Sequence, residues 1–480
     1  MRRLIARLSA LPHGIRAAML YAVAMGWAKA LAMVTLPLIT AMLSPAEFGR
    51  LELLSSAAEI GGLLCGAGLV DTLYRFGSVP GAEGRAVSAR LTGLALVIAA
   101  LATAILLLLA PVLARLMALP TPRGDIMLLA IAVSLEPVLG VSLGWLRMQR
   151  RAGAYMAFAM LRATLQYGLV ALLVATGHGT SGVLLAGCLT SLIVGSVLTR
   201  RQWRETGVRF APTASVSLLR YGLPLVASGL ANFVLGTADR WLLVGTVSAA
   251  SLGHYALAVK IAMIVALLAQ PFELWWFPQR LRFTSTPEGL ARSSRVISLA
   301  TAGMIGSGAL VAFAAPWLVR LLAPPSYVQA VPMVPFMVLA IVLQLLGNMA
   351  NVGCYTRSTG ALPMLVNGIA AAVALLLYLV LIPSFGVPGA IAATVVAQSV
   401  RFSVFAVLSQ RTVPLTWPYG RLAALSVVAA GVAALPQFAS PRVSVACLLG
   451  LGLIAGAGVA GRWLRRPGRG LGLMGNRLEV

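Results

Sequence analysis

Long apolar stretches recur along the whole chain, and short polar or Gly/Pro-rich breaks separate them. Each stretch is close to the roughly 20 residues that a helix needs to cross a bilayer. Barrel strands would instead alternate polar with apolar positions over about ten residues. The pattern therefore predicts about fourteen transmembrane helices. The predicted spans cover residues 17–43, 51–74, 91–118, 125–148, 152–176, 180–199, 218–246, 249–278, 296–322, 328–355, 361–382, 387–409, 420–437 and 442–461.

A polar link at residues 200–217 lies close to the middle of the chain and divides the spans into two groups. Each group opens with a similar turn, at 44–49 and 251–255, in which an aromatic residue lies near a glycine. Parallel repeats of a transporter would give such a pattern. The predicted arrangement is an N-terminal six-helix lobe at 1–199, a cytoplasmic linker at 200–217, a second six-helix lobe at 218–409, two peripheral helices at 410–461 and a basic tail at 462–480.

The composition agrees with an all-α polytopic membrane protein. Hydrophobic residues make up 60% of the chain and charged residues 10%, and the mean hydropathy is +0.93. A soluble domain carries about 25% charged residues. Because the apolar stretches run from one end of the chain to the other, no segment is left for a separate soluble domain.

The net charge of +25 is distributed unevenly between the two sides of the predicted membrane. If the N-terminus is cytoplasmic, only five of the 37 Lys and Arg residues fall on the opposite side. This asymmetry follows the positive-inside rule and predicts a bacterial inner-membrane protein with both termini in the cytoplasm. We expect the basic tail to contact lipid head groups rather than nucleic acid.

Four basic residues lie within predicted spans, where an ionisable group is costly unless it faces a cavity or a partner. They are Lys29, Arg162, Arg240 and Lys260, and the two lysines are the only ones in the chain. Arg162 and Glu136 fall near mid-depth of consecutive antiparallel spans, so their side chains can pair. Such a pair either holds the bundle together or contacts a ligand, and both interpretations stay open.

Two glutamates of the second predicted span share one helix face, because Glu52 and Glu59 are seven residues apart. Glu59 lies deep enough in its span to approach Lys29. We hypothesise that these two side chains pair, and that protonation of the glutamate releases the lysine. Such a step would couple a proton gradient to the charge of a substrate.

Gln344, Asn348 and Asn351 form a polar stripe on one face of the tenth predicted span. Hydrogen bonds between helices explain such a stripe, and so does contact with a substrate. Asp239 and Arg240 lie toward the end of the seventh span. Because adjacent side chains on a helix point about 100° apart, we expect these two to contact different neighbours rather than each other.

The chain lacks the common motifs of soluble chemistry. No G-x-x-x-x-G-K-[ST] motif for ATP occurs. The three histidines are scattered and form no metal or catalytic set, and the four cysteines are widely separated within spans. We therefore expect no cofactor, no metal site and no enzymatic activity, and energy must come from a gradient, a partner or removal of the product.

Several short segments occur in a characteristic order on this layout: LPL at 36–38 before LSPAEFG at 43–49, GL at 68–69 before YRF at 74–76, DRW at 239–241, and LGHYALAVK at 252–260. Together they resemble the oligosaccharide flippases of the polysaccharide transporter family, within the multidrug/oligosaccharidyl-lipid/polysaccharide exporter superfamily. The resemblance implies two six-helix lobes around a central cationic cavity, with the last two helices outside. It also implies a polyprenyl-pyrophosphate-linked oligosaccharide as substrate, moved from the cytoplasmic to the periplasmic leaflet for O-antigen or exopolysaccharide biosynthesis.

A diphosphate needs cations along its path, and the deep polar residues supply them. The predicted substrate path comprises Lys29, Arg162, Arg240, Lys260 and Asn348. The candidates for coupling or ion pairing are Glu59, Glu136 and Asp239. The predicted partners are the lipid-linked oligosaccharide and membrane lipids, with a polysaccharide polymerase and chain-length proteins as protein candidates.

Three other functions compete with this prediction. A drug or cation antiporter of the same superfamily should have a mainly acidic cavity, whereas the deep residues here are at least as basic as acidic. A membrane-bound polymerase or ligase should carry a large periplasmic loop, and none of the predicted outward loops is long. A non-transporting scaffold for a synthesis complex would leave the buried charges unexplained.

Overall fold

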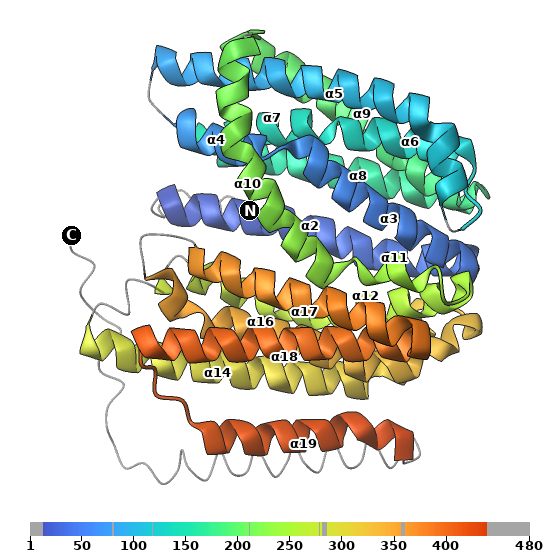
Figure 1. Ribbon diagram of the computed structural model, residues 1–480, viewed down its shortest axis with the longest axis vertical. Helices are drawn as coiled ribbons and strands as arrows, with labels where there is room; N and C mark the ends of the chain where they lie inside the picture. The colour runs from blue at the N-terminus through green and yellow to red at the C-terminus, as the bar shows by residue number, and fades with distance from the viewer. Residues whose placement is uncertain are drawn as a thin grey trace, which may run out of the picture.

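The computed structural model describes residues 13–78, 81–117, 119–210, 212–277, 279–280, 286–356 and 361–438. Every regular element within these residues is a helix, which confirms the all-α prediction (Figure 1). The elements are α2 (His13–Met42), α3 (Pro45–Gly66), α4 (Leu69–Phe76), α5 (Ala82–Leu116), α6 (Arg123–Ser134), α7 (Glu136–Met148), α8 (Ala152–Ala175), α9 (Gly179–Thr206), α10 (Pro212–Gly236), α11 (Asp239–Leu243), α12 (Ala249–Trp276), α14 (Pro287–Phe313), α15 (Ala315–Leu322), η1 (Pro325–Met333), α16 (Val334–Ala350), η2 (Val352–Tyr355), α17 (Ala361–Phe385), α18 (Val387–Thr412) and α19 (Tyr419–Phe438).

The described residues contain twelve helical segments that are long and apolar enough to cross a membrane. They match the first twelve predicted spans in order, and a shorter apolar helix at Tyr419–Leu435 matches the thirteenth. The predicted span at 442–461 and the tail at 462–480 lie outside the described residues. The chain is therefore a multi-pass membrane protein.

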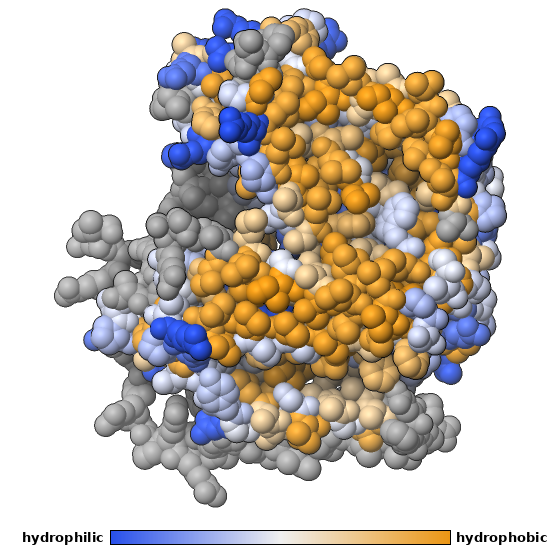
Figure 2. All heavy atoms as spheres, viewed as in Figure 1, coloured by the Kyte–Doolittle hydropathy of each residue, from blue (hydrophilic) through white to orange (hydrophobic). Residues whose placement is uncertain are grey.

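The surface carries the apolar belt that such a protein needs. Figure 2 shows hydrophobic residues across the middle of the visible face and hydrophilic residues toward the edges where the helices end. Large apolar side chains on this surface are strongly exposed, such as Leu108 at 79% and Leu299 at 76%. In water such exposure would be unfavourable, whereas in a bilayer these side chains contact lipid.

The helices gather into two halves that lie side by side (Figure 1). The first half holds α3 to α9, with α2 packed along α8, and the second holds α12 and α14 to α18. Helix α10 crosses between them and contacts α3 and α4 on one side and α17 on the other. Helix α19 packs outside the second half against α14. The predicted linker at 200–217 is mostly helical, because α9 continues to Thr206 and α10 begins at Pro212.

Several spans that the hydropathy pattern predicts as single helices are broken near their middle. The second span divides into α3 and α4 at Ala67 and Gly68, whose φ angles are 45° and 66°. The fourth divides into α6 and α7 at Leu135, because Pro137 in the first turn of α7 cannot donate a hydrogen bond back to the preceding turn. Broken helices leave backbone groups and side chains available at mid-membrane depth.

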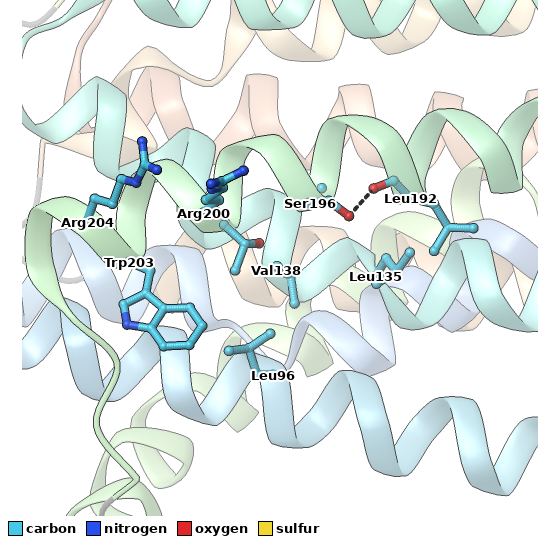
Figure 3. A pocket seen from close by; sticks show the side chains of 10 residues that line it. Leu96, Leu135, Val138, Leu192, Ser196, Arg200, Trp203 and Arg204 are labelled. Atoms are coloured by element: carbon cyan, nitrogen blue, oxygen red, sulfur yellow. Dashed lines mark hydrogen bonds between the residues drawn. The ribbon is translucent and has the colours of Figure 1, made fainter.

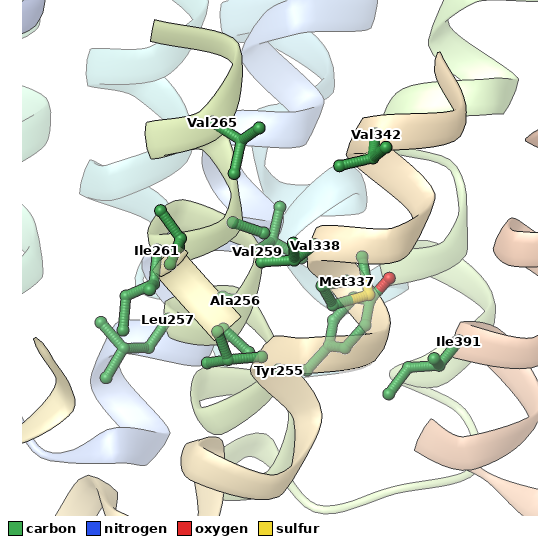
Figure 4. Packing of buried hydrophobic residues seen from close by; sticks show 14 of the residues in the cluster. Tyr255, Ala256, Leu257, Val259, Ile261, Val265, Met337, Val338, Val342 and Ile391 are labelled. Atoms are coloured by element: carbon green, nitrogen blue, oxygen red, sulfur yellow. The ribbon is translucent and has the colours of Figure 1, made fainter. Parts of the chain in front are cut away.

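Helix α12 lies at the centre of the second half and is buried over most of its length. Figure 4 shows Tyr255 and Val259 of α12 beside Met337 and Val338 of α16. Tyr255 is fully buried, and the other three residues are each less than 9% exposed. This packing holds α12 rigidly, so the charged residues that α12 carries have defined positions.

Candidate functional site

A polar cavity of about 460 Å³ lies inside the first half of the molecule. Arg162 of α8 donates a hydrogen bond to Glu136 Oε1 of α7 across it, and the two side chains form an ion pair. Their side chains are 33% and 37% exposed. The remaining lining residues come from α3, α6, α8 and α9: Ser55, Ala58, Glu59, Gly62, Ala132, Val133, Gln166, Gly187 and Ser191.

Local sequence explains why this cavity exists. The break at Leu135 places Glu136 in the first turn of α7, where the positive end of the helix dipole favours a carboxylate. Gln166 follows Arg162 by one helical turn and therefore shares its face. Gly62 and Gly187 leave room in front of Glu136 and Gln166, whose nearest side-chain atoms would each lie 3.6 Å from an added Cβ. The pairing of Glu136 with Arg162 that the sequence allowed is therefore present.

Glu59 lines the same cavity but does not have the partner that we hypothesised. Its Oε2 accepts a hydrogen bond from Thr237 Oγ1 at 2.8 Å. Among the described residues, no ion pair joins it to Lys29, which instead lies close enough to Glu273 to act on that carboxylate electrostatically. The hypothesis failed because depth alone does not fix the direction in which a helix face points.

A second group of charged residues is buried where the two halves meet. Lys260 Nζ of α12 lies 2.7 Å from Glu52 Oε1 of α3, and Arg240 Nε lies 3.8 Å from Glu52 Oε2. Glu52 and Arg240 each expose 8% of their side chains, whereas Lys260 exposes 36%. Asp239 accepts a hydrogen bond from the buried hydroxyl of Tyr255. Two acids thus balance two bases across the interface.

The expectation that Asp239 and Arg240 avoid each other was wrong. Asp239 Oδ1 accepts a hydrogen bond of 2.8 Å from the backbone N–H of Arg240 and lies 3.6 Å from Arg240 Nη1. The angle of about 100° separates adjacent side chains only at their bases. The arginine side chain is long enough to turn its guanidinium back toward the neighbouring carboxylate.

One face of α3 forms most of the contact between the two halves, which we call the seam. It presents residues at heptad-like spacing, namely Gly49, Glu52, Ser56, Glu59, Leu63 and Ala67. A Cβ added at Gly49 would lie 2.2 Å from Ala249 O, so α3 and α12 approach closely only because glycine stands there. Further along, Ser56 Oγ accepts a hydrogen bond of 2.8 Å from Trp241 Nε1, and Gly222 of α10 packs on Ala67. The seam is therefore closed along most of α3.

The end of the molecule where α3 and α12 begin carries further contacts between the halves. We call it the outer end, since the charge pattern predicts that the starts of α3 and α12 face the periplasm. Tyr327 donates a hydrogen bond of 2.9 Å to Leu43 O, and Thr40 donates one to Leu322 O. The ring of Phe48 stands edge-on to that of Tyr327, with centroids 5.9 Å apart. These contacts close the outer end.

A third polar group lies within the second half and contains three residues that the sequence does not single out, Glu273, Asn367 and Arg401. Asn348 donates to Glu273 Oε1 at 3.1 Å and accepts from Arg401 Nη2 at 3.0 Å. Arg401 also donates to Asn367 Oδ1 at 2.9 Å. Arg401 lies inside the predicted span 387–409, although the charge asymmetry groups it with the cytoplasmic arginines. Arg401 lies two helical turns from the end of that span, and this depth indicates that its side chain lies among the helices.

The amide stripe on the tenth predicted span connects helices in this group. Asn348 bridges α12 and α18, and Asn351 Oδ1 accepts a hydrogen bond of 2.8 Å from Arg280 Nη1. Both amides thus make the contacts between elements that one of the two interpretations expected. A role for Asn348 in a substrate path stays a prediction.

The sequence model for the family described as "Polysaccharide biosynthesis protein" matches residues 15–279, which is more than half of the chain. The chain belongs to the polysaccharide biosynthesis protein family. The match includes α3, α12 and most of α2 at the outer end, and the cavity around Arg162. No curated protein matches the chain in sequence.

Solved structures share the fold of this polysaccharide biosynthesis protein. The lipid II flippase MurJ in an inward closed conformation superposes with a TM-score of 0.71 at 11% identity, over 93% of this chain and 100% of that one. The MATE multidrug transporter DinF-BH gives 0.61 at 17% identity, over 84% and 96%. An outward-facing MATE transporter of the MOP superfamily gives 0.55 at 16% identity, over 88% and 98%. The fold is therefore the one seen in these flippase and multidrug-transporter structures.

Proposed function

We propose that the protein moves an oligosaccharide linked to polyprenyl pyrophosphate from the cytoplasmic to the periplasmic leaflet of a bacterial inner membrane, for surface polysaccharide biosynthesis. The family supports a role in making polysaccharide, and the fold is that of transporters. The observation that carries the proposal is the exposure of the Arg162 side chain inside the helix bundle. It lies in the middle of a membrane-spanning bundle and yet is one third exposed, at 33%, to a polar cavity.

An arginine in this setting suits a diphosphate. Its planar guanidinium offers paired N–H donors that match phosphate oxygens, and a charge-assisted hydrogen bond is about twice as strong as a neutral one. Glu136 holds the guanidinium in place through an ion pair whose two side chains are 33% and 37% exposed. Gln166 and Ser191 line the same cavity and provide hydrogen-bonding groups for sugar hydroxyls.

The direction of entry follows from where the halves touch. The outer end is closed by the glycine crossing of α3 and α12 and by the Tyr327 and Thr40 hydrogen bonds. We propose that a substrate enters from the opposite, inner end, where α10 packs against the end of α3 and must move to admit it. Release at the outer end requires α3 and α12 to separate, which breaks the contact between Glu52 and Lys260.

The proposal is tested with purified protein in vesicles that contain a fluorescent lipid-linked oligosaccharide. Leaflet exchange is followed by quenching with a reagent that cannot cross the membrane. We expect Arg162→Gln to slow exchange roughly tenfold or more, since hydrogen bonds to charged groups contribute about 1.5–3 kcal/mol. The exchange rate of Arg162→Lys should lie between those of the wild type and Arg162→Gln, because lysine keeps the charge but loses the paired donors.

The matched control for Arg162→Gln is Arg295→Gln, which removes an exposed arginine near the start of α14. It should exchange the lipid at the wild-type rate. A normal rate in Arg162→Gln would contradict the proposed path. Extrusion of a cationic dye by the wild type, without any exchange of the lipid-linked glycan, would favour a drug exporter instead.

We further propose that Glu59 takes up the proton that couples transport to a gradient. It is exposed, lines the cavity, and within the described residues has a hydroxyl rather than a cation as its hydrogen-bond partner. Glu59→Gln keeps an acceptor for Thr237 but cannot bind a proton. We expect its exchange rate to lose its response to an imposed pH gradient, whereas Glu83→Gln, at the exposed start of α5, should respond like the wild type. An unchanged gradient response in Glu59→Gln would exclude the residue as the coupling site.

A further inference from the structure

A second cavity, of about 590 Å³, forms a groove in the first half between α5, α7 and α9. Leu96 of α5, Leu135 at the α6–α7 break and Val138 of α7 form its apolar walls (Figure 3). It is separate from the cavity around Arg162, because α9 contributes Gly187 and Ser191 to that cavity and the next residues along the helix, from Leu192 onward, to the groove.

Helix α9 gives the groove one apolar end and one basic end. Leu192, Ser196, Arg200 and Arg204 recur every four residues and so lie along one face of the helix (Figure 3). Between them Gly195 lacks a side chain, and an added Cβ would meet its nearest atom, Leu139 Cδ2, only at 3.8 Å. The groove therefore stays open beside a helix that would otherwise fill it.

The two arginines of the groove have no acidic partner among the described residues. Arg201, which lies between them in sequence, donates to Glu205 Oε1 at 3.3 Å, but Arg200 and Arg204 form no such pair. Both are exposed, and Trp203 beside them is 62% exposed. Tryptophan is enriched at the level of lipid head groups, so this end of the groove lies at the membrane surface.

We propose that the groove binds an anionic phospholipid of the cytoplasmic leaflet. The phosphate contacts Arg200 and Arg204, and one acyl chain lies against Leu96, Leu192 and Val138. Charge complementarity selects the head group, since basic pockets between membrane helices on the cytoplasmic side bind anionic lipids. From Arg200 to Leu192 the helix rises about 12 Å, which matches the upper part of an acyl chain.

A sugar-bearing lipid fits this groove poorly. Ser196 is the hydroxyl at its middle, and its Oγ already donates to Leu192 O at 2.6 Å (Figure 3). Apart from Thr199 and the arginines, the other lining residues are apolar or glycine, except for the indole of Trp203. An oligosaccharide would leave most of its hydroxyls without partners here, whereas a small phosphate head group would not.

The test measures lipid binding directly. Delipidated wild-type protein in detergent is titrated with phosphatidylglycerol or with phosphatidylcholine, and bound lipid is counted by native mass spectrometry. Arg200→Gln/Arg204→Gln should bind phosphatidylglycerol about 30-fold more weakly and phosphatidylcholine unchanged, given what each basic residue contributes near an anionic lipid surface. The control Arg295→Gln/Arg411→Gln removes the same charge from exposed positions of the second half and should bind like the wild type.

A second variant tests the groove itself. Ser196→Phe fills the groove while both arginines remain, and it should also lose phosphatidylglycerol, whereas Ser196→Ala should not. Normal binding by the arginine double variant would overturn the proposal. So would normal binding by Ser196→Phe, because the arginines would then attract lipid without a groove. One-for-one displacement of the bound phospholipid by polyprenyl pyrophosphate, with the same dependence on Arg200 and Arg204, would assign the groove to the transported lipid and also overturn it.

Discussion

The pairs Arg162–Glu136 and Lys260–Glu52 use the same chemistry in different surroundings. The first joins neighbouring helices within one half, and its side chains are 33% and 37% exposed. The second joins α12 to α3 across the two halves, and its lysine is 36% exposed whereas its glutamate is only 8% exposed. Arg240 and Asp239 extend the second pair into a buried group, whereas Glu136 and Arg162 face a polar cavity.

This difference separates binding from closure. An exposed ion pair contributes little to stability because water already solvates both charges, so it can open for a ligand at small cost. In the second pair Lys260 is still 36% exposed, but Glu52 and the neighbouring Arg240 have lost that water, so these two charges depend on their partners. The exposed pair is therefore suited to meet a substrate, and the buried pair is suited to hold the outer end shut.

The largest loss of stability is expected from removing Glu52, the acid that contacts both Lys260 and Arg240. Glu52→Gln leaves Lys260 and Arg240 with Asp239 as the remaining anion of the group. Breaking a buried pair in this way costs about 3–5 kcal/mol, and Asp239 should keep the loss near the lower value. The free energy of unfolding in mixed micelles measures it.

Glu83→Gln is the matched control for this prediction, since the same change falls on an exposed residue in the first turn of α5. Its unfolding free energy should stay within about 0.5 kcal/mol of the wild type. Equal stability of Glu52→Gln and Glu83→Gln would remove the distinction between a buried and an exposed site.

The glycine crossing at the outer end gives the next largest effect. A Cβ at residue 253 would lie 1.9 Å from Pro45 O, so Gly253→Ala must push α12 away from α3. Overpacking of this kind costs about 1–3 kcal/mol. Distances between spin labels at the starts of α3 and α12 should lengthen, which shifts the protein toward an outward-open state.

Gly303→Ala provides the comparison, because no atom outside its own helix lies within 4 Å of the position of its Cβ. The label distances in this variant should match those of the wild type. If Gly253→Ala also leaves them unchanged, then the crossing of α3 and α12 does not control closure of the outer end.

Hydropathy alone predicted most of the fold, because the length and apolarity of a span are local properties of the chain. It also placed Glu136 and Arg162 at matching depths, and they pair. It did not show which helix faces meet. Glu59 therefore received the wrong partner, and Arg240 was expected to avoid Asp239. These contacts depend on the break between α10 and α11 and on the approach of α3 to α12, which only the packed structure shows.

The polar group around Arg401 was missed for a different physical reason. Long basic side chains near span ends normally reach the membrane surface, so Arg401 was counted with the cytoplasmic charges. In the structure its guanidinium points to Asn348 and Asn367 of neighbouring helices. The depth of a charged residue within a predicted span therefore predicts the surroundings of its side chain better than the charge of the nearest loop does.

The smallest effect on stability is expected at the exposed pair. Glu136→Gln makes the same chemical change as Glu52→Gln, but Arg162 stays solvated by the cavity. The unfolding free energy should therefore fall by less than about 1 kcal/mol. Lipid exchange should still slow, because Arg162 loses the group that orients its guanidinium. A loss of stability as large as that of Glu52→Gln would show that this pair is structural, and the cavity would then have no free cation to offer a diphosphate.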